Sequence, residues 1–145
     1  MRDGDLILPR RSFVALCGPA GSGKSAFAHE FVRRNGLATT AAVSSDTCRL
    51  LLCDALRSVK PSEWPLLQVQ TFELFLSIIG RRMSLDRPIL ADTVNLYLEL
   101  RPRMLQLAKA HGYPTALVVF DMSLATCLEQ NAQRGATIPE DNIRE

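Results

Sequence analysis

Residues Gly18 to Ser25 read GPAGSGKS and match the pattern G-x-x-x-x-G-K-[S/T] at every fixed position. The glycines of such a segment let the backbone curl, so that successive N–H groups point at one anion. Lys24 is expected to reach the β- and γ-phosphates of a nucleotide, and the Ser25 hydroxyl to be a ligand of Mg²⁺. The segment therefore predicts binding of a nucleoside triphosphate. The residues predicted to hold the phosphates are Gly18, Gly21, Ser22, Gly23, Lys24 and Ser25.

The segments on either side of this loop supply the context that phosphate binding needs. Residues 12–17 (SFVALC) are apolar and favour a buried strand, and residues 26–34 carry Phe27 and Phe31 four positions apart, which favours a helix. The positive end of that helix would add to the field on a bound anion. The alternative is a glycine-rich turn with an accidental Lys-Ser pair, and the flanking strand and helix argue against it.

The rest of the chain alternates short apolar runs with segments of helical periodicity. Strands of this kind, separated by helices, favour an α/β fold with a central parallel sheet of about four strands, covered by helices on both faces. We expect a single domain over residues 1–145, and Ser45 or Asp46 as the N-cap of its second helix. The other predicted strands are residues 41–44, 89–91 and 115–120, and the other predicted helices are residues 46–56, 66–83, 97–111 and 122–134.

Carboxylates follow several predicted strands, at the edge of the sheet where α/β proteins bind ligands. Asp92 follows the run PILA and is predicted to hold Mg²⁺ beside the loop serine; the alternative is a helix cap. Asp46 follows the second strand, with Arg49 three residues later. Asp46 could take the proton of an attacking hydroxyl while Arg49 grips a phosphate, or Asp46 could cap a helix and pair with Arg49 on the surface. Spacing alone leaves these two interpretations balanced.

Four segments together resemble the kinase module of phage and bacterial polynucleotide 5′-kinases, within the wider P-loop kinase group. The resemblance covers roughly nine-tenths of the chain and implies a P-loop NTPase fold with a short helical lid at about residues 128–140. It also implies ATP and Mg²⁺ as cofactors, and the 5′-hydroxyl of an RNA or DNA end as the acceptor. The segments are GPAGSGKS at 18–25, VSSDTCR at 43–49, ADTVNLYLELR at 91–101 and VVFDMSLATCLEQNAQR at 118–134.

The resemblance implies a role for each residue that matches a motif of the family. Asp46 would be the general base, Lys24 and Arg134 would act on the triphosphate, and Arg134 would do so from the lid. Arg49 would hold the 3′-phosphate of the terminal nucleotide. Ser25 and Asp92 would be the metal ligands. The residues implied to bind the acceptor are Arg49, Asn95 and Arg101.

The chain also departs from the pattern of that family. Gln130 stands where relatives carry a second lid arginine, a further lid arginine is replaced within residues 135–137, and Val94 stands where a threonine is common. A lid arginine can be worth ~10³-fold or more in rate, so these changes predict either reduced activity or substitution by a nearby cation such as Arg144. We also expect a C-terminal helix found in relatives to be missing. Two alternatives stay open: a kinase for a small-molecule hydroxyl, and a nucleotide-binding regulatory module without transfer activity.

Composition limits the classes of protein to which the chain can belong. A net charge of +2 gives no strong general attraction to nucleic acid or membrane, so any nucleic-acid site must be a local basic groove. No apolar stretch approaches the ~20 residues that span a bilayer, and the first residues do not form a signal peptide. The four cysteines lack C-x-x-C spacing and are predicted to be small core residues. We expect a cytoplasmic protein that binds no membrane.

Overall fold

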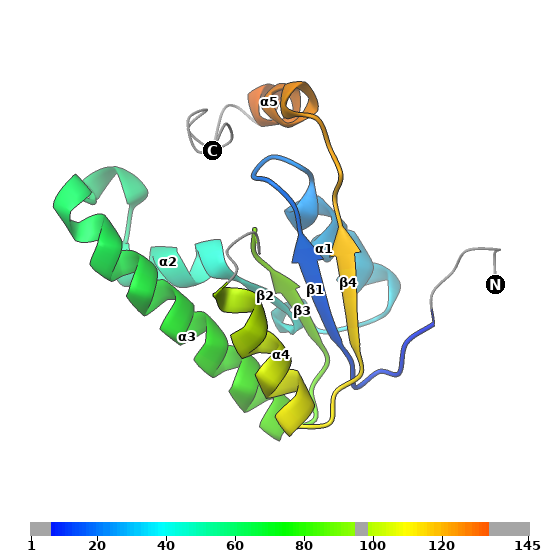
Figure 1. Cartoon of the computed structure of the whole chain (residues 1–145). Coiled ribbons are helices and arrows are strands. Elements are labelled where there is room, and N and C mark those ends of the chain that lie inside the picture. Colours follow the sequence, from blue (N-terminus) through cyan, green and yellow to red (C-terminus); the bar gives the residue numbers. More distant parts are fainter. Residues whose placement is uncertain (1–6, 95–98, 134–145) are drawn as a thin grey trace.

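Four parallel strands form the centre of the molecule (Figure 1). The structure is a computed structural model and describes residues 7–94 and 99–133. Each strand lies within one residue of its predicted bounds, so the predicted parallel sheet is confirmed. The strands are β1 (Phe13–Cys17), β2 (Ala42–Ser44), β3 (Ile89–Asp92) and β4 (Thr115–Val119), and they lie in the order β2-β3-β1-β4.

Four of the five helices occupy the connections between the strands, as expected for parallel strands that need crossovers, and the fifth follows β4. The α4 helix carries Pro102 at its third residue, in the first turn, where the missing N–H breaks no helical hydrogen bond. Among the described residues, no helix has the length and apolar character needed to cross a bilayer. The helices are α1 (Lys24–Arg34), α2 (Ser45–Cys53), α3 (Trp64–Ser84), α4 (Leu100–Ala110) and α5 (Leu124–Gln133).

Alternating side chains of the strands build one core on each face of the sheet. Phe13 and Ala15 point to the face that α3 and α4 cover, where Phe75 of α3 is fully buried. Val14 and Leu16 point to the opposite face, which α1 covers. Figure 1 shows these three layers, with α3 and α4 on one side of the sheet and α1 on the other. The prediction of helices on both faces is therefore confirmed.

β4 lies at the edge of the sheet and is less covered than its apolar sequence suggests. Leu117 is 51% exposed and Val119 is 62% exposed, although both alternate with half-buried neighbours. They extend the row of side chains that begins with Ala15 and Cys17 of β1, because those residues are their partners in the sheet register. The helices α3 and α4 therefore cover that row over β1 and leave it exposed over β4.

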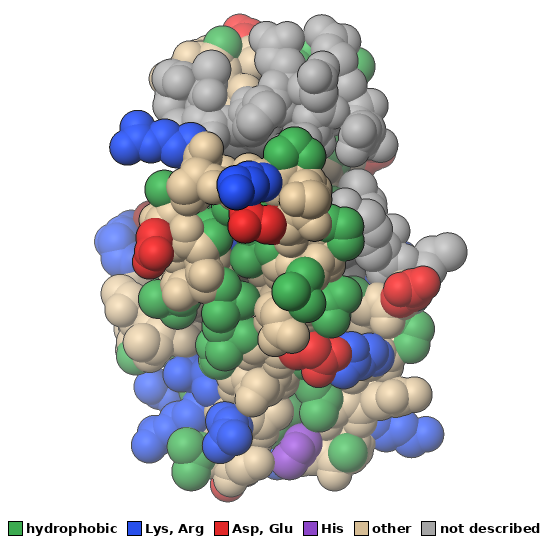
Figure 2. Space-filling view, turned by 90° about the vertical axis from the view of Figure 1, so that its left-hand side faces the viewer, with side chains coloured by type: hydrophobic (Ala, Val, Ile, Leu, Met, Phe, Trp, Pro, Cys, Tyr) green, Lys and Arg blue, Asp and Glu red, His purple; other side chains and the backbone are tan. Residues whose placement is uncertain are grey.

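A second exposed apolar area surrounds the connection from α2 to α3. Figure 2 shows this side of the molecule, where hydrophobic side chains lie among charged ones. Only one face of the 21-residue helix α3 is buried, because the other points away from the sheet. The exposed hydrophobic residues of this area are Leu50, Leu51, Leu52, Leu56, Leu66 and Val69.

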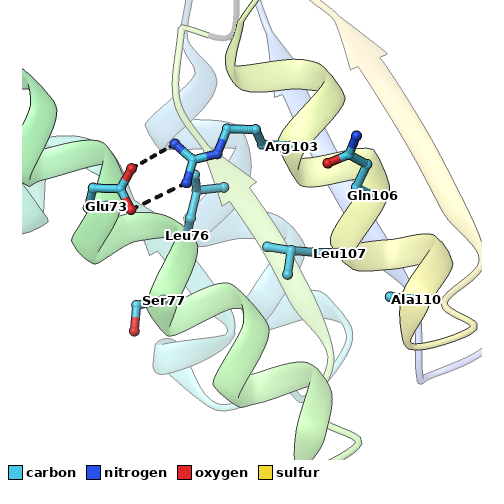
Figure 3. Close-up of a pocket in the computed structure, with 7 residues that line it drawn as sticks. All are labelled: Glu73, Leu76, Ser77, Arg103, Gln106, Leu107 and Ala110. Atoms are coloured by element: carbon cyan, nitrogen blue, oxygen red, sulfur yellow. Dashed lines mark hydrogen bonds and ion pairs between the residues drawn. The ribbon is translucent and has the colours of Figure 1, made fainter.

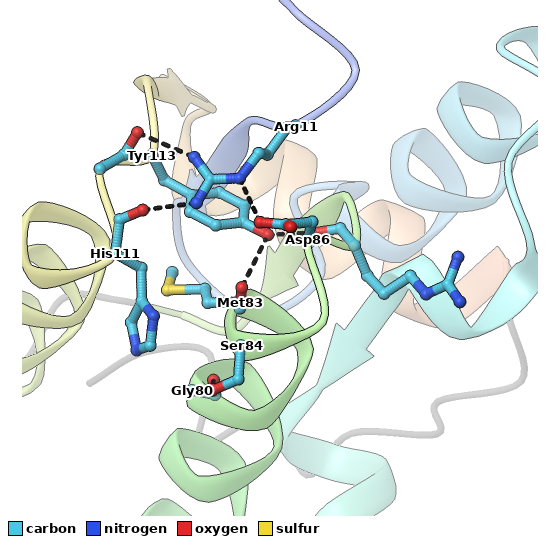
Figure 4. A network of polar contacts seen from close by, with 9 residues as sticks. Arg11, Gly80, Met83, Ser84, Asp86, His111 and Tyr113 are labelled. Atoms are coloured by element: carbon cyan, nitrogen blue, oxygen red, sulfur yellow. Dashed lines mark hydrogen bonds and ion pairs between the residues drawn. The ribbon is translucent and has the colours of Figure 1, made fainter.

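A polar network joins the connections at the opposite end of the sheet from the strand carboxyl ends (Figure 4). The guanidinium of Arg11 donates to Asp86 at 2.6 Å and to the backbone oxygens of His111 and Gly112, at 2.5 and 3.0 Å. It also stacks over the Tyr113 ring, 4.1 Å from the centroid. One side chain thus ties the start of β1 to the α3–β3 and α4–β4 connections.

Candidate active site

The loop between β1 and α1 has the backbone conformation that its glycines predict. Gly21 and Gly23 have φ angles of 79° and 93°, in the left-handed region that favours glycine. Gly23 is the N-cap of α1, which begins at Lys24, so the first N–H groups of the helix face the loop. A backbone of this shape, followed by a helix N-terminus, is an anion-binding arrangement.

Lys24 is buried inside this loop, with only 7% of its surface exposed. Its ammonium donates to the backbone oxygens of Gly18 and Pro19, at 2.9 and 2.8 Å. Burial lowers the pKa of Lys24, and the carboxylates of Asp92 and Asp46 offset part of that shift. The positive charge is therefore held in the loop by neutral oxygens and by two nearby acids.

Ser25 and Asp92, the predicted metal ligands, are in direct contact. The hydroxyl of Ser25 donates to a carboxylate oxygen of Asp92 at 2.9 Å. Burial raises the pKa of Asp92, while the hydrogen bond from Ser25 and the charge of Lys24 lower it. Hydroxyl and carboxylate oxygens are the donors that Mg²⁺ prefers, so this pair fits the ion. Within residues 7–94 and 99–133, no three acidic, His or Cys side chains cluster as a metal site.

Asp46 and Arg49 lie on α2, which starts at the same edge of the sheet. Ser44 pairs with Asp92 in the sheet register, and its hydroxyl accepts from the backbone N–H of Thr47 as the N-cap of α2. The prediction of Ser45 or Asp46 as the cap is wrong by one or two residues, because Ser44 is both the last residue of β2 and the cap, with the extended backbone that an N-cap has. The Asp46 carboxylate is 78% exposed and accepts from Arg49 at 2.6 Å. Since Asp46 is not the cap, its carboxylate stays available to a ligand.

A buried pair of hydroxyls connects the start of α2 to the end of β3. Ser45 donates to the side-chain oxygen of Thr93 at 3.1 Å, and both residues are almost fully buried. Ser45 is the first residue of α2 and Thr93 directly follows Asp92. The start of α2 is therefore fixed relative to Asp92. The sequence analysis missed this contact, because two hydroxyls 48 residues apart carry no local signal.

Arg101, Asn95 and Arg134 are the other residues that were predicted to bind ligands. Arg101, near the start of α4, donates to the sulfur of Cys17 at 3.2 Å, at the end of β1. Asn95 and Arg134 lie outside the described residues, as does the lid after residue 133. Cys17, Cys48 and Cys127 are buried, as predicted for small core residues, whereas Cys53 is half-buried.

Helix α5, which holds the start of the predicted lid, packs against the phosphate-binding loop (Figure 1). A Cβ atom added to Gly21 would lie 2.8 Å from the backbone oxygen of Cys127. One added to Gly23 would lie 3.8 Å from the side-chain oxygen of Gln130. Gln130, which replaces a lid arginine of the resembling family, therefore faces the loop.

A hollow between α3 and α4 lies apart from this edge (Figure 3). It has a volume of about 440 Å³, and all seven residues that line it come from those two helices. Arg103 bridges it through two hydrogen bonds to Glu73, at 2.7 and 3.3 Å. It contains none of the strand-end residues, so we treat it as a groove between packed helices.

A buried lysine followed by a serine on a glycine loop, with carboxylates at the next strand ends, defines a nucleotide-binding protein of the P-loop kinase class. The chain belongs to the AAA_33 family of P-loop kinases: the family model, described as "AAA domain", matches residues 13–145. No curated protein matches the sequence.

Solved structures share the fold at low sequence identity. A chain of the Pnkp1/Rnl/Hen1 RNA repair complex is 21% identical with a TM-score of 0.70; the match covers 98% of this chain but 44% of that one. A gluconokinase from Sinorhizobium meliloti 1021 is 17% identical with a TM-score of 0.60, over 94% and 73% of the two chains. The Mycobacterium tuberculosis APS kinase CysC is 17% identical with a TM-score of 0.62, over 91% and 78%. These kinases act on different acceptors, so the likeness shows the fold and not the acceptor.

Proposed function

We propose that this chain transfers the γ-phosphoryl group of ATP to the 5′-hydroxyl of an RNA or DNA end. The observation that carries the proposal is the Asp46–Arg49 pair at the start of α2, at the same sheet edge as Lys24 and the Ser25–Asp92 pair. Asp46 is also near enough to raise the pKa of both Lys24 and Asp92. A base, an anion receptor and a phosphate cradle then share one edge, as transfer to a hydroxyl requires.

Each group has one task in the transfer. Asp46 accepts the proton of the 5′-hydroxyl, whose oxygen forms a bond to the γ-phosphorus while the bond from that phosphorus to the β–γ bridging oxygen breaks and ADP leaves. Lys24 exchanges its backbone partners for phosphate oxygens, where its charge stabilises the transferring group. Ser25 and Asp92 would hold Mg²⁺, which when bound neutralises charge on the phosphates.

A second acceptor class has support of its own. The fold is shared with a gluconokinase and an APS kinase at TM-scores close to that of the RNA repair protein. In this second proposal the loop and Asp46 keep their tasks, and the acceptor is a small molecule with a hydroxyl. The Arg49 guanidinium then favours a molecule that carries an anionic group.

The test is a transfer assay with γ-labelled ATP. It offers 5′-hydroxyl RNA, 5′-hydroxyl DNA and a panel of small hydroxyl compounds to the wild type, Asp46→Asn and Asp54→Asn. Asp54 is a matched control, because it is an exposed carboxylate at the other end of α2. We expect label on the oligonucleotides, a ~10²–10⁴-fold loss of kcat in Asp46→Asn with ATP binding retained, and little change in Asp54→Asn.

Three other results would each revise the proposal. Label on a small compound alone supports the second acceptor class. ATP binding without transfer to any acceptor supports the regulatory module instead. Equal activity of Asp46→Asn and Asp54→Asn shows that Asp46 is a surface ion-pair partner and not the base.

A further inference from the structure

Arg49 is held by two acceptors, only one of which lies on its own helix. Its guanidinium donates to Asp46 of α2 at 2.6 Å, and to the side-chain oxygen of Gln68 on α3 through Nε and one terminal nitrogen, at 3.2 and 2.9 Å. The Arg49 side chain is only 14% exposed, against 78% for Asp46. The contact with Gln68 therefore anchors a largely buried guanidinium to α3 as well as to its own helix.

Gln68 can orient Arg49 without placing a further negative charge beside it. Three hydrogen bonds use three of the five N–H groups of a guanidinium, which leaves two for a ligand. The amide oxygen of Gln68 is neutral, so it directs the plane of the guanidinium while Asp46 supplies the single negative charge. A carboxylate at position 68 would hold the plane equally well but would add a second negative charge beside the cation, and an anionic ligand would then gain less.

We infer that Gln68 is a positioning residue, which holds the Arg49 guanidinium ready for an anionic group next to the reacting hydroxyl of the acceptor. The inference rests on the proposed function, because it assigns Gln68 to acceptor binding at the same edge. It differs from a purely structural role, in which Gln68 only packs α2 on α3. A structural role predicts equal effects on all acceptors, and a positioning role predicts effects on anionic acceptors alone.

The experiment measures steady-state kinetics on two acceptors that differ only in the anionic group. They are a nucleoside 3′-monophosphate and the corresponding nucleoside, each with a free 5′-hydroxyl. The variants are Gln68→Ala, Gln68→Glu and Gln70→Ala, which is a matched control on the same helix because Gln70 is exposed. A fourth variant combines Gln68→Ala with Arg49→Ala.

Gln68→Ala is expected to raise the KM for the monophosphate ~3–10-fold, the effect of one lost neutral acceptor, and to leave the KM for ATP and for the nucleoside unchanged. Gln68→Glu should raise the KM for the monophosphate further, because it keeps the geometry and adds a second negative charge beside Arg49. In the Arg49→Ala background, Gln68→Ala should have no added effect, since its action runs through Arg49. Gln70→Ala should match the wild type.

Two results would overturn the inference while leaving the proposed function intact. One is Gln68→Ala behaving like Gln70→Ala on the monophosphate. The other is an equal rise in KM for both acceptors, which indicates a structural role. A wild type that transfers phosphate to neither acceptor nor to an oligonucleotide contradicts the proposed function itself, and the inference falls with it.

Discussion

Replacing Gly21 by alanine tests whether α5 is packed on the phosphate-binding loop. Gly21 has φ = 79°, and an added Cβ would lie 2.8 Å from the Cys127 backbone oxygen of α5. Gly36 offers a matched control, because its φ is also positive (60°) but nothing lies within 4 Å of an added Cβ. Both substitutions strain the backbone in the same way, and only one of them meets a neighbour.

The expected free-energy changes follow from these two geometries. The left-handed backbone costs an L-residue ~1–2 kcal/mol, offset by ~0.4–1 kcal/mol from the lower entropy of the unfolded chain. Gly36→Ala should therefore lower the free energy of unfolding by ~1 kcal/mol. Gly21→Ala adds the contact with Cys127, which as overpacking costs a further ~1–3 kcal/mol. At ~2–4 °C per kcal/mol, the Tm of Gly21→Ala should lie several degrees below that of Gly36→Ala.

Two assays, both without nucleotide, measure the difference between Gly21→Ala and Gly36→Ala. Thermal unfolding gives the Tm of each variant, and hydrogen exchange gives the protection of residues 124–133. We expect faster exchange in α5 for Gly21→Ala only, because its Cβ displaces that helix. Equal Tm values for the two variants, together with unchanged exchange in α5, would refute the packing of α5 on the loop.

Three further outcomes follow from the other contacts. Lys24→Met should abolish ATP binding as measured by calorimetry, with a melting temperature no lower than that of the wild type, since it removes a buried charge; unchanged affinity would contradict its role. Burial lowers the pKa of Lys24 below its ordinary 10.5, so in the alkaline range below 10.5 the Lys24 side chain binds more protons in the unfolded chain than in the folded one. The free energy of unfolding of the wild type, relative to that of Lys24→Met, should therefore rise with pH across that range in chemical denaturation. Arg11→Ala should lower the free energy of unfolding by ~1–2 kcal/mol in the same assay, because it removes two hydrogen bonds to backbone carbonyls and a cation–π contact, and it should leave ATP affinity unchanged. Arg11→Lys should recover only part of this free energy, because an ammonium cannot reach all the partners at once.

Local signals carried most of what the sequence could predict. The loop motif and its flanking strand and helix are contiguous, so residues 12–34 were predicted nearly as the structure has them. The N-cap of α2 was misplaced because Ser44, Ser45 and Asp46 can all cap a helix. The end of β2 at Ser44 was predicted correctly, but this last strand residue is also the cap, because an N-cap keeps an extended backbone.

Features that depend on the order of the strands could not be predicted in the same way. The apolar composition of residues 115–120 (TALVVF) favours a buried strand, yet β4 lies at the sheet edge and exposes Leu117 and Val119. Gln68 carries no motif, and only the packing of α3 on α2 brings it to Arg49, 19 residues away in sequence. The roles of Asp46 and Arg49 remain predictions, although the structure brings them to the edge where they would act.

The two backbone oxygens that hold Lys24 have a consequence for how long a ligand stays. A buried ammonium that lost its ligand would be left unpaired, at a cost of several kcal/mol. Here the ammonium can return to Gly18 and Pro19, at 2.9 and 2.8 Å, within the same loop. In the proposed function, phosphate binding is therefore an exchange of partners for Lys24, which weakens the hold on the phosphate and lowers the barrier to its departure. Such an exchange would favour a short residence time for the nucleotide, and hence rapid release of product.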